Sequence, residues 1–389
     1  MIESAFRRWF YDARVRAWIS QAAVAGFMLA TIWYFVANAS ENMVKAGIAS
    51  GFDFLWRGSG IDVPFRIVEY SPQGTILSLL WVGVTNTLLV ALLGMVFATI
   101  LGFLIGIARL SKNFLLRSLA GGYVEFVRNI PLLLFVFFWY FGVIRALPPP
   151  RASWDFGGIA FLNTRGLYVP SPNDPAVFAG LPIVLAIAAV CFLLVRRWAR
   201  RRQAETGEAF PLWLAGVALF GLVPLAALVI AALSTGWDVP ALRGFNFRGG
   251  FVLIPEFVAL FAALVTYTAG FVAEVVRGGI LAVGKGQKEA ALSLGLTPGQ
   301  TLRLIVIPQA LRVMVPPMTS QYLNLLKNSS FGAAIAYPEV VSVFMGSALN
   351  ATGQAIEIIA ITLAIYLSIG LAVSAFMNWY NARIALVTR

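Results

Sequence analysis

The chain has 389 residues, of which 60% are hydrophobic and 12% are charged, and its mean hydropathy is +0.83. The apolar residues gather into runs of about 20, the length that crosses a bilayer, which excludes a water-soluble enzyme and a disordered chain. The 29 Lys and Arg exceed the 17 Asp and Glu, but no run of alternating basic and aromatic residues lies on a polar surface. We therefore expect the charge to set membrane orientation, with no nucleic acid as partner.

The residue types that carry most enzyme chemistry are scarce. Histidine is absent, and Cys191 is the one cysteine. This excludes histidine-based acid–base catalysis, a disulfide within the chain and a Cys/His metal cage. We therefore expect no catalytic residue and no metal site on this chain.

Eight apolar stretches predict eight transmembrane helices and hence an all-α polytopic membrane protein. They cover residues 17–38, 79–108, 129–145, 178–195, 210–233, 253–276, 313–327 and 354–380. If the N-terminus is cytoplasmic, about two thirds of the Lys and Arg lie on the cytoplasmic side. The positive-inside rule then predicts that both termini are cytoplasmic.

The first stretch has two interpretations. Its basic flank and Ala37-Asn38-Ala39 imitate a secretory signal with a small-residue cleavage site. A signal core has about 7–15 apolar residues, however, whereas residues 17–36 are long enough to span. This favours an uncleaved anchor helix, followed over 48–55 by an interfacial helix on the outer surface.

Prolines and glycines interrupt the middle of the chain. Their density over residues 146–177 predicts an irregular outer loop. The two stretches at 178–233, joined by the basic residues 196–202, are typical of an inserted helical hairpin.

The loop between the sixth and seventh stretches carries strong local signals. Residues 287–294 are rich in helix formers, and Gly295 predicts a left-handed stop. Thr297 and Gln300 predict a capping box, with Pro298 at the first position of the next helix. Pro308 then breaks or kinks that helix. Two helices too short to span either dock into a groove of a partner or pack on their own bundle, and the capping pattern leaves both open.

Glu289-Ala290-Ala291, Gly295, Ile305 and Pro308 resemble the EAA loop of ABC importer permeases, with Ile307 where that pattern usually has Leu. The resemblance extends to the polar amino-acid permease family through Thr85-Asn86-Thr87-Leu88 and through residues 123–133 and 274–280. It covers roughly 79–145 and 253–382. The insertion and residues 47–55 make the chain most similar to permease subunits for general L-amino acids or for glutamate, glutamine, aspartate and asparagine.

The resemblance implies a five-helix core of the ABC type I importer kind, formed by spans two, three, six, seven and eight. Residues 1–78 would be the anchor helix and periplasmic interfacial segment, and 79–145 the first part of the core. Residues 146–252 would form the inserted loop and hairpin. Residues 253–389 would complete the core and include the coupling loop 283–312.

The same resemblance implies the partners. A dimeric ATPase would hold ATP and Mg²⁺, so that this chain needs no cofactor of its own. A second homologous permease subunit and a periplasmic amino-acid-binding protein would complete the importer in the bacterial inner membrane. Glu289, Ala290, Ala291 and Gly295 would form the coupling helix in the ATPase cleft, with Pro308 ending the motif.

Polar residues within spans are costly and must face protein, water or substrate. Ser320, Gln321, Asn324, Lys327 and Asn328 share one helical face, either as a polar path or as an interhelical contact. A second face carries Tyr267, Gly270, Glu274 and Arg277.

Charge complementarity would let Glu274 receive the α-ammonium and Lys327 the α-carboxylate of an amino acid. The alternative for Glu274 is an i, i+3 pair with Arg277, and Glu125 and Arg128 suggest a similar pair. The predicted substrate path is therefore Tyr267, Glu274, Ser320, Asn324 and Lys327.

Two other classes of function fit single features of the sequence. An ion-coupled secondary transporter would use Glu274, Lys327 and Glu357, but the chain lacks paired Gly/Pro-interrupted segments in matching halves. An intramembrane hydrolase would need a pair such as Ser330 with Lys327. Residues 279–286 imitate a phosphate-binding loop but lack Ser or Thr after Lys285, which excludes ATP binding there.

Overall fold

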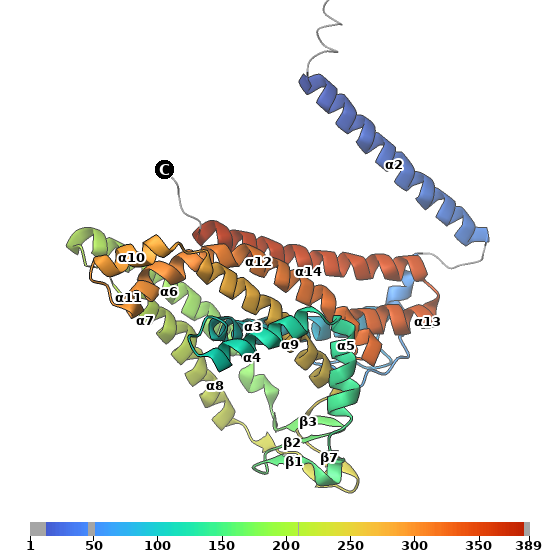
Figure 1. Cartoon of the computed structure of the whole chain (residues 1–389). Coiled ribbons are helices and arrows are strands. Elements are labelled where there is room, and N and C mark those ends of the chain that lie inside the picture. Colours follow the sequence, from blue (N-terminus) through green and yellow to red (C-terminus); the bar gives the residue numbers. More distant parts are fainter. Residues whose placement is uncertain (1–12, 46–50, 209, 385–389) are drawn as a thin grey trace, which may run out of the picture. The chain divides into compact units, whose positions relative to one another are not determined.

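The computed structural model describes residues 13–45, 51–208 and 210–384, and most of them are helical (Figure 1). The α-helices are α2 (Ala13–Lys45), α3 (Ile76–Ala108), α4 (Phe114–Arg128), α5 (Leu132–Phe137), α6 (Leu181–Thr206), α7 (Leu212–Val217), α8 (Val223–Ser234), α9 (Pro255–Leu281), α10 (Lys285–Ser293), α11 (Pro298–Thr301), α12 (Ile307–Asn328), α13 (Leu349–Thr352) and α14 (Ala355–Ile384).

Short helical segments of other pitch link or extend these helices. The 3₁₀ segments are η1 (Asp53–Trp56), η3 (Pro150–Ala152), η4 (Pro175–Phe178) and η7 (Ser329–Ile335). The π segments are η2 (Phe138–Ile144), η5 (Ala218–Leu222), η6 (Leu302–Val306) and η8 (Val341–Ala348). The predicted interfacial helix over 48–55 lies partly outside the described residues, and its described end contributes to η1.

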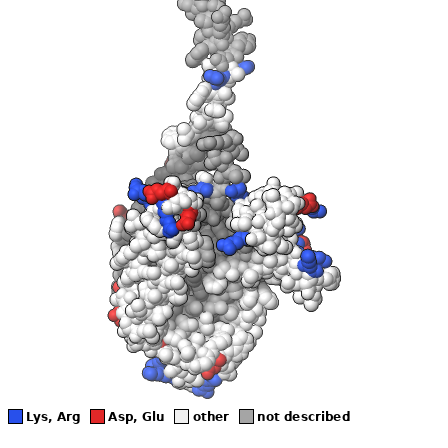
Figure 2. Space-filling model, turned by 90° about the vertical axis from the view of Figure 1, so that its left-hand side faces the viewer, with Lys and Arg blue, Asp and Glu red and all other residues white. Residues whose placement is uncertain are grey.

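Six helical segments in the described part of the chain are long and apolar enough to cross a membrane. A seventh span is obtained if α4 and the α5–η2 segment count as one, although the chain bends by 108° between them. The bend follows from Pro131, which has no N–H to continue a helix and caps the start of α5. Broad areas of the surface in Figure 2 carry no charged side chain, as a lipid-facing surface requires.

The predicted count of eight spans is therefore not confirmed. The difference lies at the predicted stretch 313–327, where α12 is a continuous helix but is not among the segments apolar enough to qualify. Its polar residues, which suggested a path or a contact face, are the physical reason.

The described residues form two compact units. One comprises the described residues up to Leu89 together with Pro338–Trp379, and its core is apolar. Within this unit, the Asn86 side chain donates to the carbonyl oxygens of Phe65 and Pro338 at 3.0 and 2.9 Å. The buried Glu339 carboxylate accepts the N–H groups of Val341 and Ser342 and the Tyr366 hydroxyl. These bonds join the first half of α3, η8 and α14.

The second unit comprises Val90–Tyr337 and the described part of Tyr380–Arg389. Helix α9 lies at its centre, with one buried face made largely of alanine, valine and leucine. Glycines allow close approach of its neighbours. A Cβ on Gly102 or Gly106 of α3 would lie 2.5 Å from Val272 or 2.8 Å from Ala273 of α9. These two glycines therefore let α3 pack closely against α9.

The inserted region contains short strands as well as a helical hairpin. The strands are β1 (Trp154–Phe156), β2 (Ala160–Asn163), β3 (Gly166–Val169), β4 (Ser171–Pro172), β5 (Trp237–Asp238), β6 (Ala241–Arg243), β7 (Asn246–Arg248) and β8 (Phe251–Leu253). They form an antiparallel sheet in the order β1-β2-β3-β8 and the pairs β4-β5 and β6-β7.

The prediction of an irregular loop over 146–177 was therefore wrong in part. Strand β3 pairs with β8, with Leu167 opposite Leu253, so the two ends of the insertion are joined across the hairpin. The strands have only two to four residues, too few for an alternating pattern to be visible. The predicted hairpin itself is present as α6 packed against α7, η5 and α8.

Candidate functional site

Residues 285–306 form a bent segment, called the elbow below, that consists of α10, a turn, α11 and η6. Gly295 occupies the turn with φ of +80°, which favours glycine. The N–H of Leu296 donates to Ala291 O at 3.2 Å, and that of Gly295 to Leu292 O at 2.9 Å. This pair of bonds is a Schellman motif, and it satisfies the end of α10 as the sequence predicted.

The second half of the elbow also agrees with the local sequence signals. The Thr297 hydroxyl accepts the Gln300 N–H, and the Gln300 side chain accepts the Thr297 N–H, which completes the predicted capping box. Pro298 follows the cap. Pro308 lies at the junction of η6 and α12, where the helix changes from π to α pitch, because proline removes one hydrogen bond there.

The elbow exposes both polar and apolar side chains. Glu289, Ala290 and Gly295 are exposed, whereas Ala291 is buried and packs inward. Leu294 is 83% exposed, and Leu292, Leu302 and Leu304 are also exposed. Such apolar exposure on short capped helices is typical of a docking surface. Of the predicted coupling residues, the structure therefore presents Glu289, Ala290, Gly295 and Pro308 outward and uses Ala291 to hold α10.

The elbow is attached to the helices of its unit. Helix α12 continues directly from η6 and packs along α9. The contact is tight at Gly279, where an added Cβ would lie 2.4 Å from Met314 Cγ and 3.2 Å from the backbone oxygen of Ala310. Because packed helices tend to move as rigid bodies, we expect a displacement of the elbow to be transmitted to α12 and α9.

A polar cavity of about 340 Å³ lies between α9 and α12. Its lining residues are Tyr267, Thr268, Phe271, Gln321, Asn324 and Asn328. Tyr267 and Asn324 were predicted for the substrate path, and Gln321 and Asn328 belong to the predicted polar face. Thr268 and Phe271 were missed, although they follow Tyr267 by one and four residues and share its helical face.

The other predicted path residues lie elsewhere. Ser320 and Lys327 are on the exposed side of α12 and are not among the cavity lining residues. Glu274 lies about two turns beyond Tyr267 on α9 and forms ion pairs with Arg109 and Arg277. The structure thus brings together two of the five predicted residues, and the transport roles of the other three stay predictions.

Glu274 belongs to a charged cluster formed by α9, α4 and the residue after α3. Its carboxylate accepts from Arg277 Nη2 at 2.6 Å and also from Arg109 Nη1. The i, i+3 pair offered as the alternative for Glu274 is therefore present. Arg109 also lies 4.0 Å from Glu125, whereas the described structure shows no Glu125–Arg128 ion pair.

We expect Arg109→Gln to lower the free energy of unfolding by about 1–2 kcal/mol, because it leaves Glu274 with one of its two arginine partners. Thermal unfolding in detergent measures the change. In a Glu274→Gln background the same substitution should lower the free energy of unfolding much less. Arg117→Gln, an exposed position on α4, is the matched control and should be neutral. Equal effects of the two arginine substitutions would contradict a stabilising ion pair between Arg109 and Glu274.

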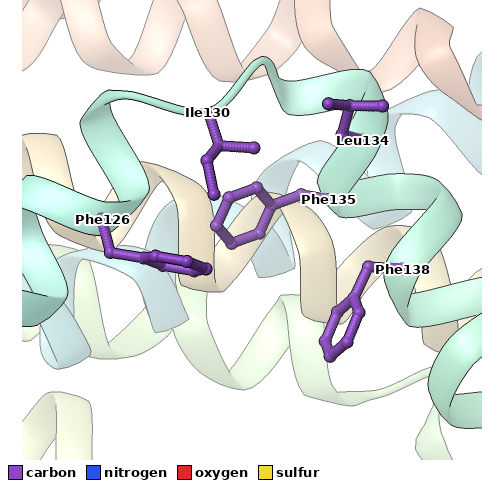
Figure 3. A pocket seen from close by; sticks show the side chains of 5 residues that line it. All are labelled: Phe126, Ile130, Leu134, Phe135 and Phe138. Atoms are coloured by element: carbon purple, nitrogen blue, oxygen red, sulfur yellow. The ribbon is translucent and has the colours of Figure 1, made fainter.

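An apolar cavity of about 300 Å³ lies beside the bend between α4 and α5 (Figure 3). Phe126, Ile130, Leu134, Phe135 and Phe138 line it. Phe135 also packs edge-on against Tyr267 at 5.6 Å between ring centroids. One wall of this apolar cavity therefore supports a ring that lines the polar cavity.

Comparison with known proteins decides the family. Residues 98–386 match the family described as "Binding-protein-dependent transport system inner membrane component". The chain belongs to this family. Membership confirms the resemblance drawn from Glu289-Ala290-Ala291 and Gly295. It also identifies the chain as a membrane component of a binding-protein-dependent transport system, with substrate capture assigned by the family description to a separate protein.

Relatives within the family match nearly the whole chain. The putative amino-acid ABC transporter permease protein YhdX of Escherichia coli is 49% identical over 98% of this chain and 97% of its own length. The general L-amino acid transport system permease protein AapQ of Rhizobium johnstonii is 46% identical over 99% and 96%. The glutamate/glutamine/aspartate/asparagine transport system permease protein BztB of Rhodobacter capsulatus is 37% identical over 97% and 96%. These matches include the inserted region, and none of the three is described as an ion-coupled transporter.

Proposed function

We propose that this chain is the permease subunit of an ATP-driven importer and conducts polar L-amino acids across the bacterial inner membrane. The observation that carries the proposal is the elbow, whose exposed Glu289, Ala290 and Leu294 are held in place by the Gly295 turn and the Thr297 cap. The names of the three relatives, all permease proteins of amino-acid transport systems, supply the substrate class.

In this proposal the energy comes from another subunit. ATP and Mg²⁺ are held by an ATPase dimer, and α10 inserts into a cleft on that dimer at the cytoplasmic face. The small Ala290 allows close approach, and Glu289 pairs with a cation of the partner. Closure of the ATPase moves α10, and the continuous path from η6 to α12 and α9 carries that movement to the polar cavity.

The polar cavity is proposed as the place where the amino acid passes. Its side-chain amides and hydroxyls both donate and accept hydrogen bonds, which suits a zwitterion with a polar side chain. No charged residue is among those lining it. Neutral partners bind such a solute without trapping it, because charge-assisted hydrogen bonds are about twice as strong as neutral ones.

The exposed side of α12 is proposed to meet a second, homologous permease. Ser320 and Lys327 are exposed there, and a polar residue at membrane depth needs protein or water beside it. A periplasmic amino-acid-binding protein then delivers substrate from the side opposite the elbow. Both termini are cytoplasmic in this arrangement, as the distribution of Lys and Arg predicts.

The decisive experiment is purification of the chain with whatever co-elutes, followed by an ATPase assay with and without a binding protein and candidate amino acids. We expect an ATPase to co-purify and to be stimulated by loaded binding protein. Amino-acid uptake by vesicles that contain this chain alone, driven by an ion gradient, would refute the proposal.

A second prediction concerns the cavity. Gln321→Leu combined with Asn328→Leu should raise the half-saturating substrate concentration for uptake roughly 30-fold, because two lost hydrogen bonds cost about 1 kcal/mol each. Uptake by proteoliposomes containing the assembled importer measures it. Thr319→Ala is the control, because the Thr319 hydroxyl bonds to Val315 O of its own helix. Unchanged uptake in the double variant would remove the cavity from the path.

A further inference from the structure

The far end of helix α6 carries a dense group of arginines that the transport mechanism does not use. Five of the seven residues from 196 to 202 are arginine: Arg196, Arg197, Arg200, Arg201 and Arg202. In the described residues, Arg202 has an ion pair with Glu208 at 3.1 Å and lies over the Trp198 ring. The structure records no ion pair for the other four. Four guanidinium groups therefore lack a carboxylate partner in the part of the chain described.

Two of these arginines continue an exposed apolar face of the same helix. Ile183, Ile187, Val190 and Leu194 are each more than half exposed and recur every three or four residues. Arg197 and Arg201 follow at the same spacing and are also exposed. The opposite side of α6 packs on α7, η5 and α8. One face of α6 is thus apolar along its length and cationic at its end.

The apolar part of this face is hollowed. A groove of about 460 Å³ is lined by Pro182, Ile183, Ala186, Ile187, Val190 and Cys191. At about 1.5 Å per residue, Val190 lies roughly 10 Å from Arg197 along the helix axis. An acyl chain attached to a head group at Arg197 is long enough to reach it.

The length of α6 allows its arginines to reach a head-group layer if the helix crosses the bilayer from Leu181. Arg197 and Arg201 lie about 24 and 30 Å from the start of α6 at Leu181, and the hydrocarbon layer is about 30 Å thick. Trp198 is half exposed beside them, and an indole ring prefers this boundary. A helix that enters the hydrocarbon near Leu181 therefore brings these guanidinium groups close to the opposite head-group layer, where phosphates lie.

We propose that α6 is a binding site for an anionic phospholipid. Arg197 and Arg201 hold the phosphodiester of the head group, and the groove beside Val190 and Cys191 receives an acyl chain. A guanidinium group offers two parallel N–H donors to a phosphate, which a single ammonium does not. Glu205 and Glu208 are the nearby acids in sequence, and Glu208 is engaged by Arg202. The site does not depend on the amino acid transported or on the ATPase.

An acidic protein surface is the competing occupant. We favour lipid because the cationic residues continue an apolar groove without a break, and a phospholipid joins an anionic head to an apolar chain in the same order. An acidic protein surface would satisfy the arginines and leave the groove uncovered. The two occupants give different results below.

A natural cysteine in the groove allows lipid binding to be followed by fluorescence. Cys191 is the single cysteine and lines the groove, so a small fluorophore attached to it reports on that position alone. The full-length chain is placed in nanodiscs with increasing fractions of phospholipid brominated on the acyl chains, with either phosphatidylglycerol or phosphatidylcholine head groups. We expect half-maximal quenching at about a tenfold lower fraction of the phosphatidylglycerol, with the preference weakening in high salt.

Matched variants separate the site from general charge. Arg197→Gln with Arg201→Gln should abolish the preference, whereas Lys112→Gln with Arg117→Gln, which removes the same charge from exposed positions near α4, should keep it. Mass spectrometry of phospholipid retained by the unlabelled chain provides a second measurement. It should show the same preference for the anionic lipid, lost in the first variant and kept in the second. Equal quenching by both lipids, or a preference that survives in the first variant, would overturn the proposal.

Two further results would also overturn it. Soluble glycerol phosphate that removes the preference at millimolar concentration would indicate a site for free phosphate and not for lipid. Complete shielding of the fluorophore from both lipids in the assembled importer, with ATPase and second permease bound, would indicate a protein surface at α6. Continued quenching by the anionic lipid in that assembly supports the proposal.

Discussion

Gly295→Val is expected to reduce amino-acid uptake by at least about tenfold while the chain still inserts into the membrane. Gly295 has φ of +80°, and a β-branched residue is strained there by about 2 kcal/mol. A strain of that size lowers the population of the native turn roughly 30-fold. The Schellman bonds from Leu296 and Gly295 are lost with it, so α10 is no longer held in the geometry proposed to dock on the ATPase. Co-purification of the ATPase and uptake in proteoliposomes measure the two consequences.

Two controls make this result specific. Gly299→Ala lies in the same elbow, where nothing is within 4 Å of an added Cβ and φ is not positive, and should retain uptake. Gly295→Asn should retain much of it, because asparagine tolerates the left-handed region better than other residues. Normal coupling in Gly295→Val would mean that the turn is not required, and the proposed role of the elbow would fail.

Gly279→Leu is expected to have the second large effect, on stability. A Cβ at Gly279 would lie 2.4 Å from Met314 Cγ and 3.2 Å from Ala310 O, so α9 and α12 must separate to admit a larger side chain. Overpacking of this kind costs about 1–3 kcal/mol. We expect a lower unfolding temperature in detergent and weak uptake, since these two helices also line the polar cavity.

The neighbouring glycine provides the control for this prediction. Gly278 is exposed and nothing lies within 4 Å of an added Cβ, so Gly278→Leu should be neutral or slightly stabilising, because glycine costs about 1 kcal/mol in a helix interior. For the smaller substitution Gly279→Ala, the second change Met314→Ala should restore part of the lost stability, because it removes the Met314 side chain that the added Cβ would contact. Similar unfolding temperatures for the two leucine variants would show that α9 and α12 are not in close contact.

Local sequence signals predicted the elbow well. The left-handed turn at Gly295, the cap at Thr297 and the position of Pro298 each depend on bonds within a few residues, so the residue types specify them without knowledge of the fold. The sequence did not indicate which residues of the elbow face outward. Ala291 is buried although Glu289 and Ala290 beside it are exposed, because packing of α10 on its own unit selects one side of the helix.

The candidate path was predicted less completely. The polar face of α12 was visible as a spacing, but spacing does not say which half of a face lines a cavity. Asn324 and Gln321 line it, whereas Lys327 on the same stripe does not, since α9 covers one side of α12 only. Charge complementarity suggested a substrate role for Glu274 and spacing suggested a pair with Arg277, but neither indicated that Arg109, 165 residues earlier, also contacts its carboxylate. A partner so distant in the chain gives no periodic signal.

Hydropathy, capping residues and a short motif determined from the sequence alone that this chain crosses a membrane several times, presents an EAA-type elbow and belongs with binding-protein-dependent permeases. These features are local or compositional, and each can be recognised one segment at a time. Only the tertiary structure decided that α12 lies against α9 through Gly279, that strands close the base of the insertion, and which polar residues share a cavity. Those results depend on contacts between segments far apart in the chain, where the fit of two surfaces, rather than the preference of either one, selects the arrangement.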